Sequence, residues 1–185
     1  MDNFEIINSN DIMELVKFTK RDFKRLAENI DSPLEMTIWA GPKYMYPLTF
    51  EQLEERMNQR INEKTKNYLF SLFDVVIKQT IGFIEIEIID EDKKIGSIQS
   101  VMIFKNFRGR NFSEKLLDLA NKYSFETLKL NRLELKVFSF NKAAISCYKK
   151  TGFVEEEIIN KIDSKTGKTF QIIAMKKEKE IKNGI

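Results

Sequence analysis

The chain has 185 residues, of which 42% are hydrophobic, and its 31 basic and 28 acidic residues leave a net charge of +3. This length and apolar content predict one domain over residues 1–185 with a sizeable core. The sequence contains no histidine and a single cysteine, Cys147, which excludes Ser-His-Asp and Cys-His nucleophilic schemes, histidine-ligated zinc, internal disulfides and cysteine-rich metal sites, so no metal is expected.

The first third of the chain is predicted to be mostly helical, because its apolar residues recur at roughly helical spacing. The loop that interrupts it contains the only tryptophan, Trp39. The expected elements are a strand at 4–7, a helix or helix pair at 11–29, a break at 31–33, a loop at 37–49 and a helix at 49–63.

The middle of the chain is predicted to form an antiparallel meander of three strands. In the second of them, alternation places Ile84, Ile86 and Ile88 on one face and Phe83, Glu85 and Glu87 on the other. The expected strands are 68–77, 81–89 and 98–104, with a charged hairpin loop at 90–94.

The last third alternates helices and strands. A helix from residue 112 is followed by a strand, by a short helix that Gly152 stops, and by a final hairpin. The expected ranges are 112–128, 133–138, 141–150, 154–161 and 169–175. The whole order predicts an α/β fold with a mixed, mostly antiparallel sheet of about seven strands and helices on both faces.

Residues 103–113 combine an apolar strand, a basic turn containing glycine and the start of a helix. The first amides of a helix lack intrahelical acceptors and lie at its positive end, so this arrangement is suited to binding phosphate. Gly109 permits close backbone approach, and Arg108 and Arg110 add positive charge. A plain strand-to-helix turn with solvated arginines is the alternative.

Two motifs together resemble the GNAT superfamily of acyl-CoA-dependent N-acetyltransferases. The family's pyrophosphate motif, Arg/Gln-x-x-Gly-x-Gly/Ala, is approximated by Arg108-Gly109-Arg110-Asn111-Phe112-Ser113, in which Asn111 and Ser113 depart from the pattern. The second motif, Asn-x-x-Ala-x-x-x-Tyr-x-x-x-Gly-Phe, is matched at every fixed position from Asn141 to Phe153. Two further segments are similar to those of a subgroup of the family, the ribosomal-protein alanine acetyltransferases. These segments are Trp39-Ala-Gly-Pro and Tyr46-Pro-Leu-Thr.

The resemblance implies a GNAT fold and an acetyl-CoA co-substrate. It implies that backbone amides of residues 108–113 hold the pyrophosphate, that Val101, Met102 and Ile103 pair with the pantetheine, and that Asn141 and Tyr148 also contact the cofactor. Tyr148 lies seven residues after Asn141, about 10 Å along the helix and on nearly the same face. The family uses the tyrosine at this position to stabilise or protonate the leaving thiolate, although an ordinary helix residue is the alternative.

The acceptor side is less determined by the sequence. An amine must lose a proton to react, and Glu85 is the best local candidate for a catalytic base and substrate contact, with a solvent-facing acidic stripe as the alternative. Some family members keep a base where this chain has Ser97. Trp39 and Tyr46 either line the acceptor pocket or clamp the first helices. Cys147 is expected to be a structural thiol, because no histidine activates it.

The expected partners are acetyl-CoA and an amine acceptor, either a small molecule or a protein N-terminus. The basic and acidic residues are intermixed, so the charge pattern does not indicate nucleic-acid binding. The sequence contains no run of about 18 apolar residues, so no membrane span is indicated. The acidic N-terminus lacks the features of a signal peptide, so a cytoplasmic location is expected. The expected assembly is a monomer or a homodimer. A non-catalytic acyl-CoA-binding or sensing module is the alternative function.

Overall fold

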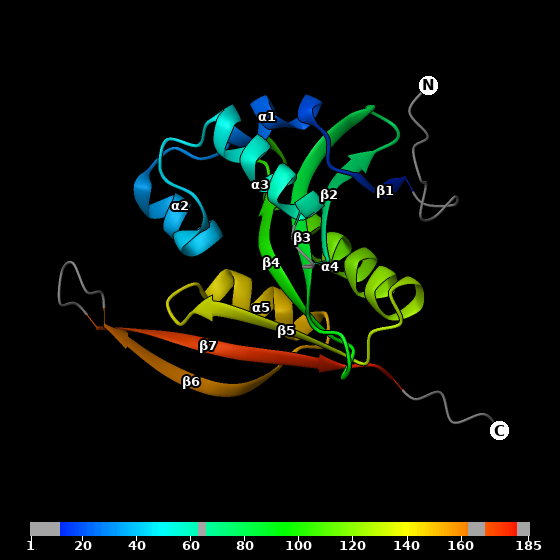
Figure 1. Ribbon diagram of the computed structural model, residues 1–185, viewed down its shortest axis with the longest axis vertical. Helices are drawn as coiled ribbons and strands as arrows, with labels where there is room; N and C mark the ends of the chain where they lie inside the picture. The colour runs from blue at the N-terminus through cyan, green and yellow to red at the C-terminus, as the bar shows by residue number, and fades with distance from the viewer. Residues whose placement is uncertain (1–11, 63–65, 163–168, 181–185) are drawn as a thin grey trace.

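A computed structural model describes residues 12–62, 66–162 and 169–180. It contains one seven-stranded sheet in the order β1-β2-β3-β4-β5-β7-β6, with helices on both faces (Figure 1). The predicted mixed, mostly antiparallel fold is confirmed, and β4 and β5 form the parallel pair. The strands are β1 Met13–Lys17, β2 Asn67–Asp74, β3 Gln79–Asp90, β4 Ile95–Ile103, β5 Arg132–Phe138, β6 Val154–Ile162 and β7 Thr169–Glu178.

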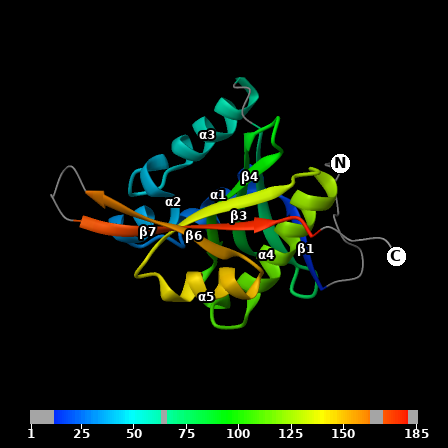
Figure 2. The ribbon, with the colours of Figure 1, turned by 90° about the horizontal axis from the view of Figure 1, so that it is seen from below.

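The helices divide into two groups, one on each face of the sheet (Figure 2). The first group precedes β2, and the second group flanks β5 in the chain. The helices are α1 Phe23–Ala27, α2 Pro33–Ala40, α3 Phe50–Asn62, α4 Phe112–Lys122 and α5 Lys142–Lys150. No helix in the described ranges combines the length and apolar content that crossing a membrane requires.

Strand β3 separates two hydrophobic cores, as its alternation predicts. Ile84 and Ile86 pack with the leucines of α4, whereas Phe83 packs with the residues of α1 and α2. Glu85 is on the Phe83 side and is fully buried there. The face that carries Glu85 is therefore the one that α1, α2 and α3 cover.

The helix predicted over 11–29 is wrong in its first half. Met13–Lys17 is the edge strand β1, which pairs antiparallel with β2, and only Phe23–Ala27 is α-helical. Leu15 packs on the α4 side of the sheet and Phe18 on the other side. A segment buried on both faces loses the alternation of a strand, so its apolar residues fell at nearly helical spacing. The strand predicted at 4–7 lies outside the described residues.

The loop predicted over 37–49 is partly wrong, because α2 extends to Ala40. Ser32 caps this helix by accepting a hydrogen bond from the Glu35 amide at 3.1 Å, and Pro33 occupies its first turn. The Asp-Ser-Pro break is thus a helix start. The strand predicted over 68–77 ends at Asp74, whose carboxylate accepts hydrogen bonds from the amides of Val76 and Ile77.

Candidate active site

Strands β4 and β5 run side by side for only a short distance. Among the described residues they pair from Ile95 to Ser97 against Arg132 to Glu134, and they part beyond that point. A bulge in β4 increases the separation, because two residues, Ser100 and Val101, stand opposite Ile84 of β3. Ser100 carries a positive φ of 52°. The sheet therefore opens at its centre, next to the predicted cofactor residues Val101, Met102 and Ile103.

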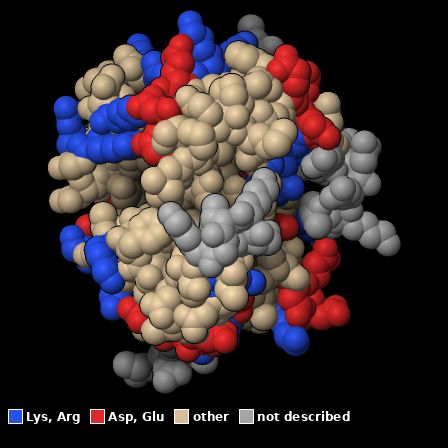
Figure 3. Space-filling view, turned by 90° about the vertical axis from the view of Figure 1, so that its left-hand side faces the viewer, with Lys and Arg blue, Asp and Glu red and all other residues tan. Residues whose placement is uncertain are grey.

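A cavity of about 820 Å³ lies where the two strands part. Its walls are α2, the following 3₁₀ turn Gly41–Lys43, the middle of β4, most of β5 and the inner part of the β6–β7 hairpin. Figure 3 shows this side of the molecule, with uncharged side chains over much of its centre and charges of both signs around its edge. The cavity thus opens on the face that carries α2.

Trp39 lies in the wall of this cavity and also fixes α2 to the sheet. Its indole N–H donates to the carbonyl oxygen of Ser100 at 2.8 Å, and its ring stacks on Tyr44 with centroids 5.6 Å apart. The two roles that the sequence left open, pocket wall and helix clamp, are therefore compatible. Tyr46 is not brought to the cavity; it is exposed, and its hydroxyl donates to the carbonyl oxygen of Asp31.

Glu85 lies behind the cavity wall with both carboxylate oxygens engaged. Arg56 Nη2 donates to Oε1 at 2.9 Å, Lys43 Nζ donates to Oε2 at 3.2 Å, and the Ser100 hydroxyl is 3.5 Å from Oε2. Burial lowers the pKa of Arg56, but the charge and hydrogen bond of Glu85 outweigh it and the pKa is raised overall. Glu87, the second acid of this face, accepts a hydrogen bond from Gln99 at 2.6 Å.

Sequence reasoning missed the two cations that hold Glu85. Arg56 carried a usable signal, because it falls three residues after Leu53 on the apolar face of α3, where an arginine requires a buried partner. Lys43 carried no such signal, since it lies in a turn 42 residues before Glu85 in the chain. Only the packing of α2 against β4 brings it there.

The turn predicted to bind phosphate has a backbone that leaves the amides at the start of α4 uncapped. Gly109 adopts φ +76°, and Asn111, the N-cap of α4, is left-handed with φ 60°. Asparagine is among the few non-glycine residues that tolerate this conformation, which explains how it replaces the glycine of the motif. The Asn111 side chain makes no capping hydrogen bond, so it does not occupy the amides at the start of α4. Arg110 is exposed, and Phe112 and Ser113 are half-buried.

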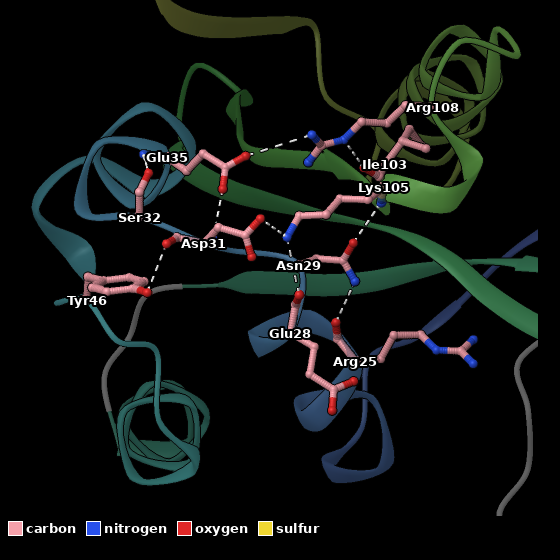
Figure 4. Close-up of polar contacts among 10 residues, drawn as sticks. All are labelled: Arg25, Glu28, Asn29, Asp31, Ser32, Glu35, Tyr46, Ile103, Lys105 and Arg108. Carbon is pink, nitrogen blue, oxygen red and sulfur yellow. Dashed lines mark hydrogen bonds and ion pairs between the residues drawn. The ribbon is translucent and has the colours of Figure 1, made fainter.

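Arg108 points away from the start of α4 (Figure 4). Its Nε donates to the carbonyl oxygen of Ile103 at 3.0 Å, and its guanidinium lies 3.8 Å from a carboxylate oxygen of Glu35 on α2. Glu35 also accepts a hydrogen bond from the Asp31 amide, and Lys105 pairs with the Asp31 carboxylate. Arg108 therefore ties the turn to the start of α2 in this structure.

Helix α5 presents the second motif. Asn141 is its N-cap, with its side-chain oxygen 3.3 Å from the Ala144 amide that donates to it. Tyr148 packs edge-on against Phe153 within the core that contains α4, and burial, with a smaller contribution from Cys147, raises the pKa of its hydroxyl. Burial also raises the pKa of Cys147 to about 11, so this thiol stays protonated near neutral pH.

The candidate residues thus lie on both sides of the opening in the sheet. The turn at 108–113, Asn141 and Tyr148 are on the α4 and α5 side, whereas Trp39 lies in the cavity on the α2 side. Tyr148 is not among the residues that line that cavity. Across the described ranges, no three cysteine, aspartate or glutamate side chains gather as metal ligands would. The arrangement gives two approaches to the gap between β4 and β5.

Comparison with known proteins identifies one family. A profile described as "Acetyltransferase (GNAT) family" matches residues 33–153. The chain is 29% identical over 121 residues to spermidine N(1)-acetyltransferase of Vibrio cholerae, a match that spans 65% of this chain and 66% of that enzyme. It is 24% identical over 163 residues to the uncharacterized N-acetyltransferase p20 of Bacillus licheniformis, spanning 84% of this chain and 91% of the relative.

Solved structures give the same fold. The complex of the V. cholerae spermidine N-acetyltransferase with CoA and spermine superposes with a TM-score of 0.76 at 25% identity, covering 90% of this chain and 95% of that one. A dodecameric form of that enzyme gives a TM-score of 0.71 at 24% identity, covering 91% and 95%. That assembly differs from the monomer or homodimer expected here. These relatives lend no support to the expected similarity to ribosomal-protein alanine acetyltransferases.

Proposed function

Because the chain belongs to the GNAT acetyltransferase family and is an acetyl-CoA-dependent N-acetyltransferase, we propose that it acetylates a primary amine bound in the cavity beside α2. The observation that carries this proposal is the opening between β4 and β5. The uncapped start of α4 adjoins one side of the sheet, and the cavity adjoins the other. A thioester from the first side and an amine from the second would meet in the gap.

The cofactor would be held mainly by backbone groups. The left-handed Gly109 and Asn111 expose the amides at the start of α4, which suit a pyrophosphate. The free edge of β4 at Val101 to Ile103 suits the amides of pantetheine, although the Ile103 carbonyl already accepts from Arg108. Arg108 would have to leave Glu35 to reach a phosphate, so Arg110 is the better placed of the two basic side chains for that contact.

The reaction we propose is direct attack in a ternary complex. The amine lone pair attacks the thioester carbonyl carbon, the C–S bond breaks, and the amine loses its extra proton to water or a carboxylate. The Tyr148 hydroxyl would donate a hydrogen bond to the departing thiolate. Because its raised pKa disfavours full proton transfer to a thiolate whose own pKa is near 8.5, stabilisation by hydrogen bonding is the role it suits.

The first acceptors to test come from the relatives and from the sequence. One relative is named for spermidine, whereas the sequence leaves the acceptor open between a small-molecule amine and a protein N-terminus. A lysine-like amine costs about 4–5 kcal/mol to deprotonate at pH 7, and an α-amine near 8 costs much less. Purified protein would be mixed with acetyl-CoA and, in separate reactions, with spermidine, a peptide that has an N-terminal alanine, or simple monoamines. The release of free thiol would be measured in each reaction. Tight CoA binding with no turnover on any amine would instead favour the binding-module alternative.

Replacing Asn111 tests the phosphate turn separately. We expect Asn111→Gly to bind CoA as tightly as the wild type or more tightly, because glycine adopts φ 60° without strain. Asn111→Ala should weaken CoA binding several-fold and lower the free energy of unfolding by about 1 kcal/mol, since a left-handed alanine is strained. Calorimetric titration with CoA and thermal unfolding measure the two effects. Equal weakening by both substitutions would mean that the asparagine amide itself contacts the ligand.

A further inference from the structure

The carboxylates that line the cavity are already paired with cations. Glu134 and Glu156 both contact Arg132, at 2.9 and 2.6 Å, and Lys176 lies 2.9 Å from the other oxygen of Glu156. Lys176 and Arg132 hold the pKa of Glu156 below its ordinary value, so it is ionised near neutral pH. Both acids are therefore ion-paired, and because Arg132 also lies 3.5 Å from Glu178, three carboxylates share these two cations.

The remaining charges in the cavity wall are positive. Lysines contribute from three elements, namely Lys43 in the 3₁₀ turn after α2, Lys136 on β5 and Lys161 on β6. Charged groups of both signs surround this side of the molecule (Figure 3). These lysines would repel a ligand that carries several positive charges.

Among the residues that the structure describes, Glu85 is the fully buried acid behind this wall, and Lys43 stands between it and the cavity. Glu85 has no exposed surface, whereas the Lys43 side chain keeps 23% of its surface exposed and lines the cavity. The Lys43 ammonium lies 3.2 Å from Oε2. An ammonium group therefore already occupies the position from which a cationic acceptor would contact this carboxylate. Arg56 holds the other oxygen from α3 and keeps Glu85 paired if Lys43 is removed.

We propose that Lys43 is a specificity-determining residue that selects acceptors with a single amine and an uncharged body and rejects polyamines. The Lys43 ammonium makes the contact with Glu85 that the second ammonium group of a polyamine would otherwise make. This inference rests on the proposed function, because it assumes that the cavity beside α2 binds the acceptor. The proposed selectivity against polyamines would distinguish this chain from the relative named for spermidine. Like-charge contact with Lys43 opposes a polyamine, and removal of Lys43 would leave Oε2 of Glu85 able to accept a hydrogen bond from an acceptor ammonium while Arg56 still holds Oε1.

Substitution of Lys43 by an uncharged residue of similar length tests this proposal. For wild type, Lys43→Met and Lys43→Gln, kcat/KM would be measured with spermidine and with an uncharged-bodied monoamine such as benzylamine. We expect either substitution to raise the ratio of spermidine to monoamine kcat/KM roughly tenfold, the change expected when one charge-assisted hydrogen bond becomes available. Lys43→Arg, which keeps the charge, should leave the ratio near the wild-type value.

A matched control and a binding measurement separate the possible outcomes. Lys136→Met removes a charge from the same cavity without touching Glu85, so it should change the ratio by no more than about twofold. Calorimetric binding of spermidine, with no turnover involved, should tighten only in the Lys43→Met and Lys43→Gln variants. An unchanged ratio in these variants, or an equal change in Lys136→Met, would overturn the assignment. Absence of turnover with every amine in the wild type would overturn the proposed function instead.

Discussion

Tyr148→Phe is expected to lower kcat roughly 100-fold or more while leaving the affinity for CoA within about twofold. The substitution removes the hydroxyl that would donate a hydrogen bond to the departing thiolate, and loss of one such donor to a developing negative charge typically costs about 100-fold or more in rate. The phenyl ring keeps the edge-on contact with Phe153, so the fold should be retained. Steady-state rates with saturating acetyl-CoA, together with calorimetric CoA binding, measure the two quantities.

Tyr68→Phe is the matched control, because Tyr68 is also a half-buried tyrosine but packs against Phe70 on β2. Its kcat should remain at the wild-type level. The pH dependence gives a second test. The hydroxyl acts only while protonated, and burial raises the pKa of Tyr148, so any loss of rate from its ionisation is displaced above the ordinary tyrosine range near 10. Wild-type rates for Tyr148→Phe would show that this tyrosine is an ordinary helix residue.

Glu85→Gln is expected to lower the free energy of unfolding by about 3 kcal/mol, because it leaves Arg56 and Lys43 without their common buried carboxylate. For a domain of this length, that loss lowers Tm by roughly 6–12 °C. Thermal or urea unfolding measures it. Much of the effect comes from the unpaired cations, so adding Lys43→Met to the Glu85→Gln variant should restore part of the stability.

Glu87→Gln is the control for this second prediction. Glu87 is next on the same face of β3, but it is only half-buried and its partner is the uncharged Gln99. Its substitution should cost less than 1 kcal/mol. A similar Tm for Glu85→Gln and Glu87→Gln would contradict a stabilising role for the buried cluster. Glu85→Gln also tests the catalytic base expected from the sequence, a role opposed by the contacts of both Glu85 oxygens with Arg56 and Lys43, and an unchanged rate in the folded variant would exclude it.

Prediction from sequence succeeded where a local signal was strong. The alternation in β3 assigned Glu85 to the correct face, Thr49 marked the start of α3, and Asn141 marked the start of α5. It failed where local signals conflicted with packing. Strand β1 is buried on both faces and therefore lacks the alternation of a strand, and the Asp-Ser-Pro break is the capped start of α2.

The sequence by itself determined the family, the order of most elements and the location of the glycine-containing turn before α4, because these depend on short-range spacing and on backbone conformations that few residues tolerate. Gly152 illustrates this, since it was expected to stop the helix that starts at residue 141 and it follows α5 with φ +90°, a conformation that glycine adopts without strain. Only the tertiary structure decided that Arg108 contacts Glu35, that Tyr46 lies away from the cavity, and that Lys43 and Arg56 enclose Glu85. The physical reason is that each of these contacts joins side chains from separate elements, whose meeting depends on how the helices pack on the sheet.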